Sequence, residues 1–258
     1  MLYPLLWMLS ASFKTNNEIF TGINFFPKDP TFDNYISGWK GVSGYSYGRF
    51  FINSLFITGL CMIGNMVSCS MAAYAFAKLE FKLNKILFSI MMLTLMLPMH
   101  VKLIPQYIVY NELEWINTYL PLIVPKFFAV EGFFIFLLVQ FIRNISDELL
   151  EAPKIDGAGI FQIYFSFIIP LAIPALMSVA IFTFIWTWND FFSQMLYLSN
   201  PAKFTVSLAL RMFVDATGQS RWGALFAMSC LSLIPLFILF IGFQRYLIEG
   251  IAVGSVKG

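Results

Sequence analysis

Charged residues are scarce in this chain: Asp, Glu, Lys and Arg make up 12% of its 258 residues, whereas soluble domains average about 25%. Hydrophobic residues make up 59% and aromatic residues 18%. A soluble fold of this length could not keep so much apolar surface away from water, so we expect a membrane protein. The net charge of +2 is too small to indicate a nucleic-acid partner.

Metal ligands and catalytic motifs are equally sparse. His100 is the one histidine, which excludes a histidine cluster, and Cys61, Cys69 and Cys230 lie in apolar runs without CxxC spacing. The pattern GxxxxGK(S/T) is absent, so the chain is not expected to bind ATP through a P-loop, and neither GxSxG nor HExxH occurs. We therefore expect no enzyme, no metal site and no cofactor bound by this chain.

Long apolar runs are what the sequence has instead. A membrane-spanning helix needs about 20 mainly apolar residues. The strands of a membrane barrel would instead appear as short segments in which apolar and polar residues alternate, and these runs are long and continuous. A further run, 1–13, is too short to cross and is interpreted as the outer end of a truncated first span. The sequence thus predicts an all-α membrane protein with six transmembrane helices. The five complete runs are 50–77, 86–109, 119–142, 167–196 and 222–243.

The short loops indicate the orientation. Segment 78–85 holds three lysines, whereas 111–117 holds none and has two glutamates. The positive-inside rule therefore places 78–85 in the cytoplasm. Alternation then puts 143–166 and the tail, 244–258, inside the cell. Segments 14–48 and 197–221 are predicted to lie outside.

Two patterns inside the spans predict how helices pack. Gly64, Ser68 and Ala72 follow each other at intervals of four, so these small residues share one face where another helix can approach closely. Pro98 and Pro105 are seven residues apart, nearly two turns, and are expected to kink the third span on one side. Kinked helices often line a pathway, but prolines are common in membrane helices.

Polar residues within the spans are candidates for the substrate pathway. Glu131 lies midway along the fourth span and is expected to face a cavity or an interhelical partner. Lys126 is the nearest opposite charge, but five residues turn an α-helix by about 140°, so no intrahelical pair is expected. Asn65 is interpreted as an interhelical hydrogen bond more readily than as a ligand contact.

The string WTWND, residues 186–190, ends the fifth span on the predicted outer side. One interpretation is an aromatic belt at the membrane surface followed by a polar helix exit. The other is sugar recognition, with Trp188 stacking on a sugar ring and Asn189 and Asp190 binding hydroxyl groups. Both interpretations stay open from the residues alone.

A polar segment, ELLEAPKIDGAGIF at 148–161, separates two of the most apolar runs. Leu149, Leu150 and Ile155 can form one apolar face of a short helix. The Asp-Gly pair at 156–157 is a turn signal, because Gly157 can adopt positive φ. A second helix is expected from about residue 160, so the segment predicts a helical knob with a polar side for water or a protein partner.

This segment resembles the EAA loop of ABC importer permeases, in which Glu-Ala-Ala is followed by three residues and a glycine. The chain reads Glu151-Ala152-Pro153 and then Gly157, with Pro170 in register with the final proline of that motif. The strings TFDNY (31–35), WND (188–190) and QRYLIEGIAVGSVKG (244–258) are similar to the carbohydrate-uptake branch, above all to the second permease subunit of maltose transporters. Pro153 departs from the pattern, where a proline can kink the helix.

The resemblance implies a single transmembrane permease domain over 1–258, in the inner or plasma membrane of a bacterium or archaeon. It implies a second permease subunit, an extracytoplasmic solute-binding protein and two ATPase subunits that bind ATP and Mg²⁺. Segment 143–166 would be the coupling loop, and Gly254 and Lys257 in the tail would contact the ATPase. An ion-coupled secondary transporter is the alternative, although the two related halves that it would show are not visible. The coupling residues that the resemblance implies are Glu151, Ala152, Asp156 and Gly157.

Overall fold

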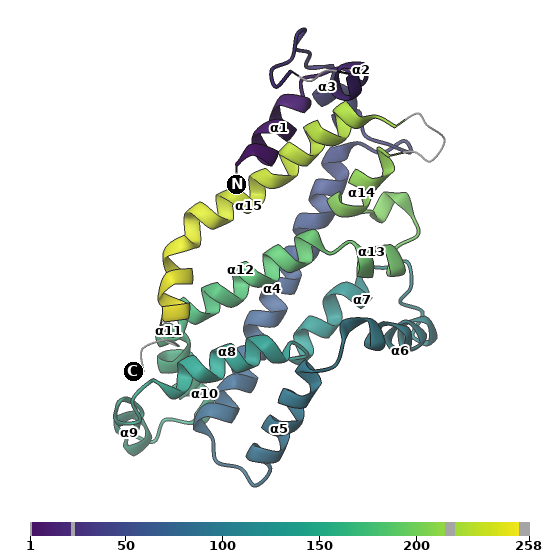
Figure 1. Ribbon diagram of the computed structural model, residues 1–258. Helices are drawn as coiled ribbons and strands as arrows, with labels where there is room; N and C mark the ends of the chain where they lie inside the picture. The colour runs from purple at the N-terminus through teal and green to yellow at the C-terminus, as the bar shows by residue number, and fades with distance from the viewer. Residues whose placement is uncertain (1, 22–23, 215–219, 253–258) are drawn as a thin grey trace. The chain divides into compact units, whose positions relative to one another are not determined.

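A computed structural model describes residues 2–21, 24–214 and 220–252 of the chain. Within these ranges the regular structure is helical, apart from one isolated bridge between Val42 and Tyr45. The chain divides into two compact units, whose helices are labelled in Figure 1. Unit 1 comprises 1–56, 116–118 and 188–239, and unit 2 comprises 57–115, 119–187 and 240–258.

Unit 1 is built from short helices around the first part of α4 and of α15. Tyr47 and Phe213 are buried in it, with ring centroids 6.2 Å apart. Gly38 lies against the side chain of Met228, which a Cβ atom would meet at 2.8 Å. The elements with residues in this unit are α1 (Tyr3–Ala11), α2 (Asn16–Thr21), α3 (Asp33–Lys40), α4 (Tyr47–Lys78), the last two residues of α12 (Ile173–Asn189), α13 (Phe192–Tyr197), η3 (Pro201–Lys203), α14 (Val206–Met212) and α15 (Trp222–Ala252).

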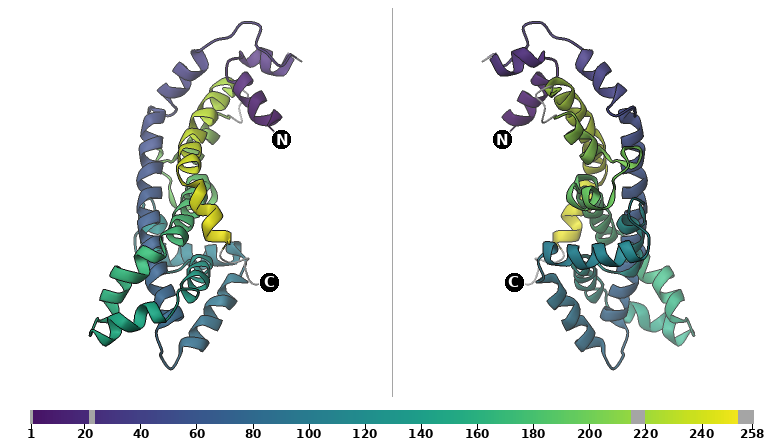
Figure 2. Two further views of the ribbon diagram at one scale, coloured as in Figure 1. Left: turned by 90° about the vertical axis from the view of Figure 1, so that its left-hand side faces the viewer. Right: turned by 90° about the vertical axis from the view of Figure 1, so that its right-hand side faces the viewer.

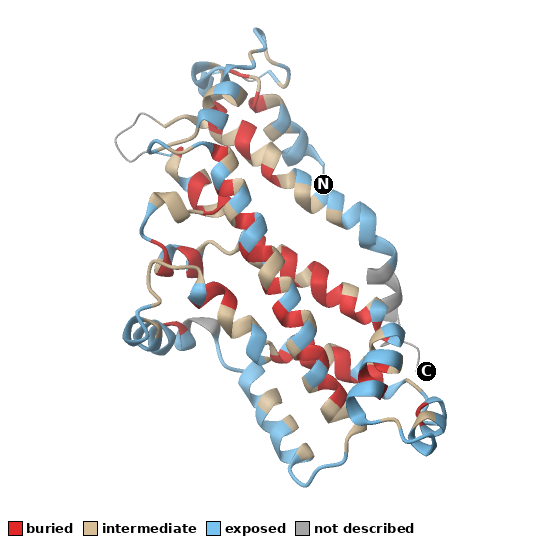
Figure 3. Cartoon of the chain, turned by 180° about the vertical axis from the view of Figure 1, so that it is seen from behind, coloured by how far each residue is buried: buried red, intermediate tan, exposed pale blue. Residues whose placement is uncertain are grey.

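Unit 2 holds most of the apolar runs, and its core contains residues from α4, α8, α9 and α12. Figure 3 marks the buried residues of the chain in red. The other elements are α5 (Asn84–Leu95), α6 (Met99–Glu112), α7 (Leu120–Ile123), η1 (Val124–Phe128), α8 (Gly132–Arg143), α9 (Glu148–Ile155), α10 (Ile160–Ile163), the π-helical η2 (Tyr164–Ile168), α11 (Ile169–Leu171) and α12 (Ile173–Asn189).

Three helical segments are long and apolar enough to cross a membrane: Tyr47–Lys78, Leu120–Arg143 and Trp222–Arg245. A fourth is obtained if Ile160–Leu171 and Ile173–Asn189, which meet at a bend of 76°, count as one span. The helical membrane architecture predicted from the sequence is therefore confirmed. The count of six spans stays a prediction.

The third predicted span, 86–109, is wrong as one continuous helix. It is divided into α5 and α6 by Pro98, whose ψ of 136° is extended rather than helical. Proline has no N–H to donate to the preceding turn, and it disfavours helical backbone in the residue before it. Pro98 therefore breaks the helix instead of kinking it, whereas Pro105 lies within α6.

The helix predicted to run on from about residue 160 is also interrupted. The π-helical turn at Tyr164–Ile168 precedes the bend at Ala172, which separates α11 from α12. Pro170 and Pro174 flank this bend, and each removes one backbone hydrogen bond of a continuous α-helix. The predicted fifth span, 167–196, is therefore not one straight helix, because it contains the bend at Ala172.

Candidate functional site

The polar segment forms the helix, turn and second helix that the sequence predicts. Helix α9 lies at the edge of unit 2, where the views of Figure 2 show the helical hairpin projecting. Leu150 is 1% exposed and belongs to the core of the unit, whereas Leu149 is 56% and Ile155 85% exposed. One leucine therefore anchors α9 while two apolar side chains are left on the surface, the arrangement of a helix that presents a face to a partner.

The turn after α9 is closed by a paired set of backbone hydrogen bonds. The N–H of Ala158 donates to the carbonyl of Pro153 at 2.9 Å, and the N–H of Gly157 donates to the carbonyl of Lys154 at 3.1 Å. This is the Schellman pattern, which needs a residue with positive φ at the position of Gly157, and its φ is +82°. Pro153 does not end the helix; its carbonyl is part of the cap.

The four predicted coupling residues are brought together by this geometry. Glu151, Ala152, Asp156 and Gly157 are all exposed, over the last turn of α9 and the turn that follows it. A Cβ atom on Gly157 would meet nothing within 4 Å. No other part of this chain therefore covers the surface at Gly157 among the residues that the structure describes. The role of this surface in coupling stays a prediction.

An ion pair that the sequence analysis missed ties this segment to α4. Lys78 Nζ lies 2.6 Å from Asp147 Oδ1 and donates to the carbonyl of Ile145 at 2.6 Å. The hydrogen bond from Lys78, together with its charge, lowers the pKa of the Asp147 carboxyl. The Lys78 side chain is 7% exposed, so these two acceptors compensate a nearly buried charge. No local signal could have shown the contact, because 69 residues separate the partners.

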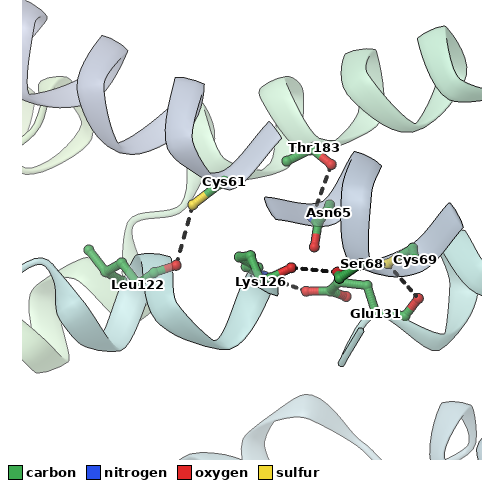
Figure 4. A network of polar contacts seen from close by, with 8 residues as sticks. All are labelled: Cys61, Asn65, Ser68, Cys69, Leu122, Lys126, Glu131 and Thr183. Atoms are coloured by element: carbon green, nitrogen blue, oxygen red, sulfur yellow. Dashed lines mark hydrogen bonds and ion pairs between the residues drawn. The ribbon is translucent and has the colours of Figure 1, made fainter. Parts of the chain in front are cut away.

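Among the polar residues of the spans, Asn65 makes the interhelical contact that was predicted. It is 1% exposed, and its Nδ2 donates to Thr183 Oγ1 of α12 at 3.1 Å (Figure 4). Its Oδ1 has no hydrogen-bond partner among the residues that the structure describes. Asn65 thus joins α4 to α12 inside unit 2.

The expectation that Lys126 and Glu131 do not pair is wrong. Their side chains form an ion pair, each just over a quarter exposed (Figure 4). The 140° argument assumed a continuous α-helix, but residues 124–128 form a 3₁₀-helix and Ala129 is left-handed with φ of 53°. The fourth span is therefore broken just before Glu131, and the break turns the two charges toward each other.

The predicted stripe on α4 receives this broken segment. Ser68 Oγ donates to the carbonyl of Lys126 at 2.7 Å. A Cβ atom on Gly64 would lie 2.9 Å from the ring of Phe127 and 3.1 Å from the carbonyl carbon of Lys126. The close approach expected at the small residues is confirmed, and Figure 4 shows the contacts from Ser68 and Cys69 that accompany it.

The residues of WTWND do not share one environment. Trp188 is 2% exposed in unit 1, where its Nε1 donates to the carbonyl of Ser232 at 3.2 Å and its ring packs edge-on against Phe51. Asn189 is exposed, and Asp190 Oδ1 accepts from the N–H of Ser193 at 3.0 Å. The tryptophan ring is thus occupied by packing, which leaves no free face for stacking on a sugar in this structure.

Two predicted contacts cannot be placed: Gly254 and Lys257 lie outside the described residues. Within the described ranges, no three His, Cys, Asp or Glu side chains gather as metal ligands.

Known proteins resemble this chain over nearly its whole length. It is 32% identical to the arabinooligosaccharides transport system permease protein AraQ of Halalkalibacterium halodurans, covering all of this chain and 91% of that one. It is 30% identical to the melibiose/raffinose/stachyose import permease protein MelC of Bacillus subtilis, covering 99% of this chain and 91% of that one.

A solved structure has the same fold. A chain of a bacterial ABC transporter involved in the import of the acidic polysaccharide alginate superposes with a TM-score of 0.83 at 24% identity, over 95% of this chain and 90% of that one. The family model described as "binding-protein-dependent transport system inner membrane component" matches residues 64–253. This chain therefore belongs to the family of inner membrane components of binding-protein-dependent transport systems, which are non-catalytic subunits.

Proposed function

We propose that this chain is a permease subunit of an ATP-driven importer for oligosaccharides, and that it forms half of the translocation pathway as one permease domain. The family match supports the transport role. Two relatives named for arabinooligosaccharides and for melibiose, raffinose and stachyose support a carbohydrate as substrate. The likeness to the alginate importer supports the fold alone.

The observation that carries the coupling proposal is the surface of α9 and its turn. Ile155 is 85% exposed, although an isoleucine in water gains nothing from such a position. It lies beside the exposed predicted coupling residues Glu151, Asp156 and Gly157. A cytoplasmic ATPase subunit that covers this surface would bury the apolar side chain and receive the turn. Motion of that subunit would be transmitted to the core of unit 2 through Leu150. It would be transmitted to α4 through the Lys78–Asp147 ion pair.

The remaining partners follow from the same proposal. Two ATPase subunits would hold ATP and Mg²⁺ on the cytoplasmic side and receive the tail, 244–258, with Gly254 and Lys257. A second permease subunit would complete the pathway beside this six-span chain, in the inner or plasma membrane of a bacterium or archaeon. A solute-binding protein would deliver the sugar to outer segments such as 197–221.

The pathway candidates take different parts in this proposal. Asn189 is exposed and suits a hydrogen bond to a sugar hydroxyl. Asp190, next to it, is partly exposed and holds the start of α13. Trp188, Asn65 and Glu131 are bonded within the chain, so we assign them to the walls that hold the pathway in shape.

The experiment compares two glycines with nearly the same positive φ in the reconstituted transporter. Gly157 and Gly44 have φ of +82° and +81°, and a Cβ atom on either would meet nothing within 4 Å. Replacing each by leucine puts a side chain at a positive φ, which costs about 1–2 kcal/mol. Gly157→Leu is expected to abolish ATP-dependent oligosaccharide uptake, because the added side chain would enter the ATPase contact. Gly44→Leu, in a predicted outer loop, is expected to leave ATP-dependent uptake unchanged.

Uptake and ATP hydrolysis are measured together in proteoliposomes. Normal uptake by Gly157→Leu would refute the coupling surface. Uptake that persists without ATP and follows an ion gradient would refute the ATP-driven importer and favour a secondary transporter instead.

A further inference from the structure

A pocket of about 760 Å³ opens where α4 ends and α5 begins, around the lysine-bearing segment 78–85. Its walls come from the end of α4, the connecting loop, the start of α5 and the last residue of α8. Asn84 fixes this loop, because its Nδ2 donates to the carbonyls of Phe76 and Leu79 at 3.3 and 3.1 Å. These are carbonyls at the end of α4, where a helix lacks its own donors. The pocket is thus held open by specific contacts.

The pocket carries an excess of positive charge. Lys82, Lys85 and Arg143 line it together with one carboxylate, Glu80, so its formal charge is three minus one, or +2. In the part of the chain that the structure describes, none of these four side chains belongs to an ion pair. The guanidinium of Arg143 lies 5.3 Å from the ring centroid of Phe88, and Arg143 lines the same pocket as the two lysines. The three cations are therefore available to an anion.

An exposed apolar stripe begins at the same place. Ile86, Ile90 and Leu93 follow one another at helical spacing along α5 and are 57%, 52% and 63% exposed. α5 has no buried residue. Cations at the mouth of a pocket and an apolar stripe leading away from it match a ligand with a charged head and apolar chains. Inorganic phosphate or an acidic peptide would use the cations and leave the stripe uncovered.

We propose that this pocket binds the anionic head group of a membrane phospholipid, with its acyl chains along the α5 stripe. Basic pockets at the cytoplasmic membrane surface are suited to phosphate-bearing head groups. Arginine can bind a phosphate with two hydrogen bonds, and lysines add charge. The inference needs the chain to lie in a membrane, with 78–85 at its surface, and does not depend on which substrate is carried.

The test measures lipid retained by the purified transporter complex, by native mass spectrometry in detergent, with phosphatidylglycerol and phosphatidylcholine as probes. Wild type is expected to retain phosphatidylglycerol preferentially. The variant Lys82→Gln, Lys85→Gln, Arg143→Gln is expected to bind it on the order of a hundredfold more weakly, at about fivefold for each cation. The matched control Lys28→Gln, Lys40→Gln, Lys102→Gln removes three exposed lysines elsewhere and is expected to bind as wild type does.

Three results would overturn the proposal. The first is unchanged phosphatidylglycerol binding in the pocket variant. The second is displacement of the lipid by inorganic phosphate at equal concentration, which would show that the acyl chains contribute nothing. The third is loss of the ATPase subunits without loss of lipid, which would mark a protein contact. Thermal unfolding in detergent checks that each variant is folded, and Arg143→Lys, which keeps the charge, is expected to retain lipid.

Discussion

Truncating Leu150 and its neighbour Leu149 to alanine separates the anchor of α9 from its outer face. Both changes remove the same atoms, but Leu150 is 1% exposed in the core of unit 2 and Leu149 is 56% exposed. A buried Leu→Ala change costs about 2–5 kcal/mol, because apolar burial is lost and a cavity is left. Surface changes stay within about 0.5 kcal/mol. We expect Leu150→Ala to weaken the docking of α9 by about 3 kcal/mol and Leu149→Ala to leave it nearly unchanged.

Hydrogen exchange in the reconstituted transporter measures this docking. A loss of about 3 kcal/mol speeds the exchange of α9 amides on the order of a hundredfold, since every 1.4 kcal/mol is a factor of ten. Leu149→Ala is expected to keep the exchange of wild type yet to lower sugar uptake per ATP hydrolysed, because it removes part of the outer face. Equal acceleration by both variants, or none by Leu150→Ala, would refute the assignment of Leu150 as the anchor.

Two further predictions concern α4 and its contacts. Gly59→Ala is expected to stabilise the protein by up to about 1 kcal/mol through helix propensity. Gly64→Ala is expected to destabilise it, because the added Cβ atom would press on Phe127 and the Lys126 backbone. Thermal unfolding in detergent should show a higher unfolding temperature for the first variant and a lower one for the second. The lowered pKa of Asp147 means that its ion pair stabilises the loop above the ordinary aspartate pKa of about 3.9, and that this stabilisation is lost as pH falls through the lower pKa of the folded state. Proteolysis of the loop in wild type, followed from pH 6 downward, should become faster as pH falls through that lower pKa. Asp147→Asn, which cannot form the ion pair, should already be cleaved faster than wild type at pH 6.

Local signals in the sequence were enough for the knob. The Asp-Gly pair predicted the turn, and the structure has the left-handed Gly157 between two helices. The small residues at Gly64 and Ser68 likewise predicted a close approach, since the absence of a large side chain is itself the signal. In these places each prediction depended on a few neighbouring residues.

The breaks and the long-range contacts could not be predicted in the same way. Nothing around Ala129, which is neither preceded nor followed directly by Gly or Pro, signals a left-handed residue. The pairing of Lys78 with Asp147 and the burial of Trp188 depend on which helices become neighbours. Helical periodicity describes one segment at a time, so it assumed a straight fourth span and misjudged its two charges.

The broken fourth span has a consequence for how the protein enters the bilayer. The carbonyl of Lys126 lies at the end of a 3₁₀-helix and accepts the hydroxyl of Ser68, a residue of α4. In hydrocarbon, a backbone carbonyl without a donor costs several kcal/mol. Ribosomal synthesis delivers α4 first, so the donor is already present when residues 120–131 emerge. Insertion of residues 120–131 into the membrane is therefore coupled to the earlier insertion of α4. A Ser68→Ala chain, which lacks this donor, should insert residues 120–131 less efficiently during biogenesis.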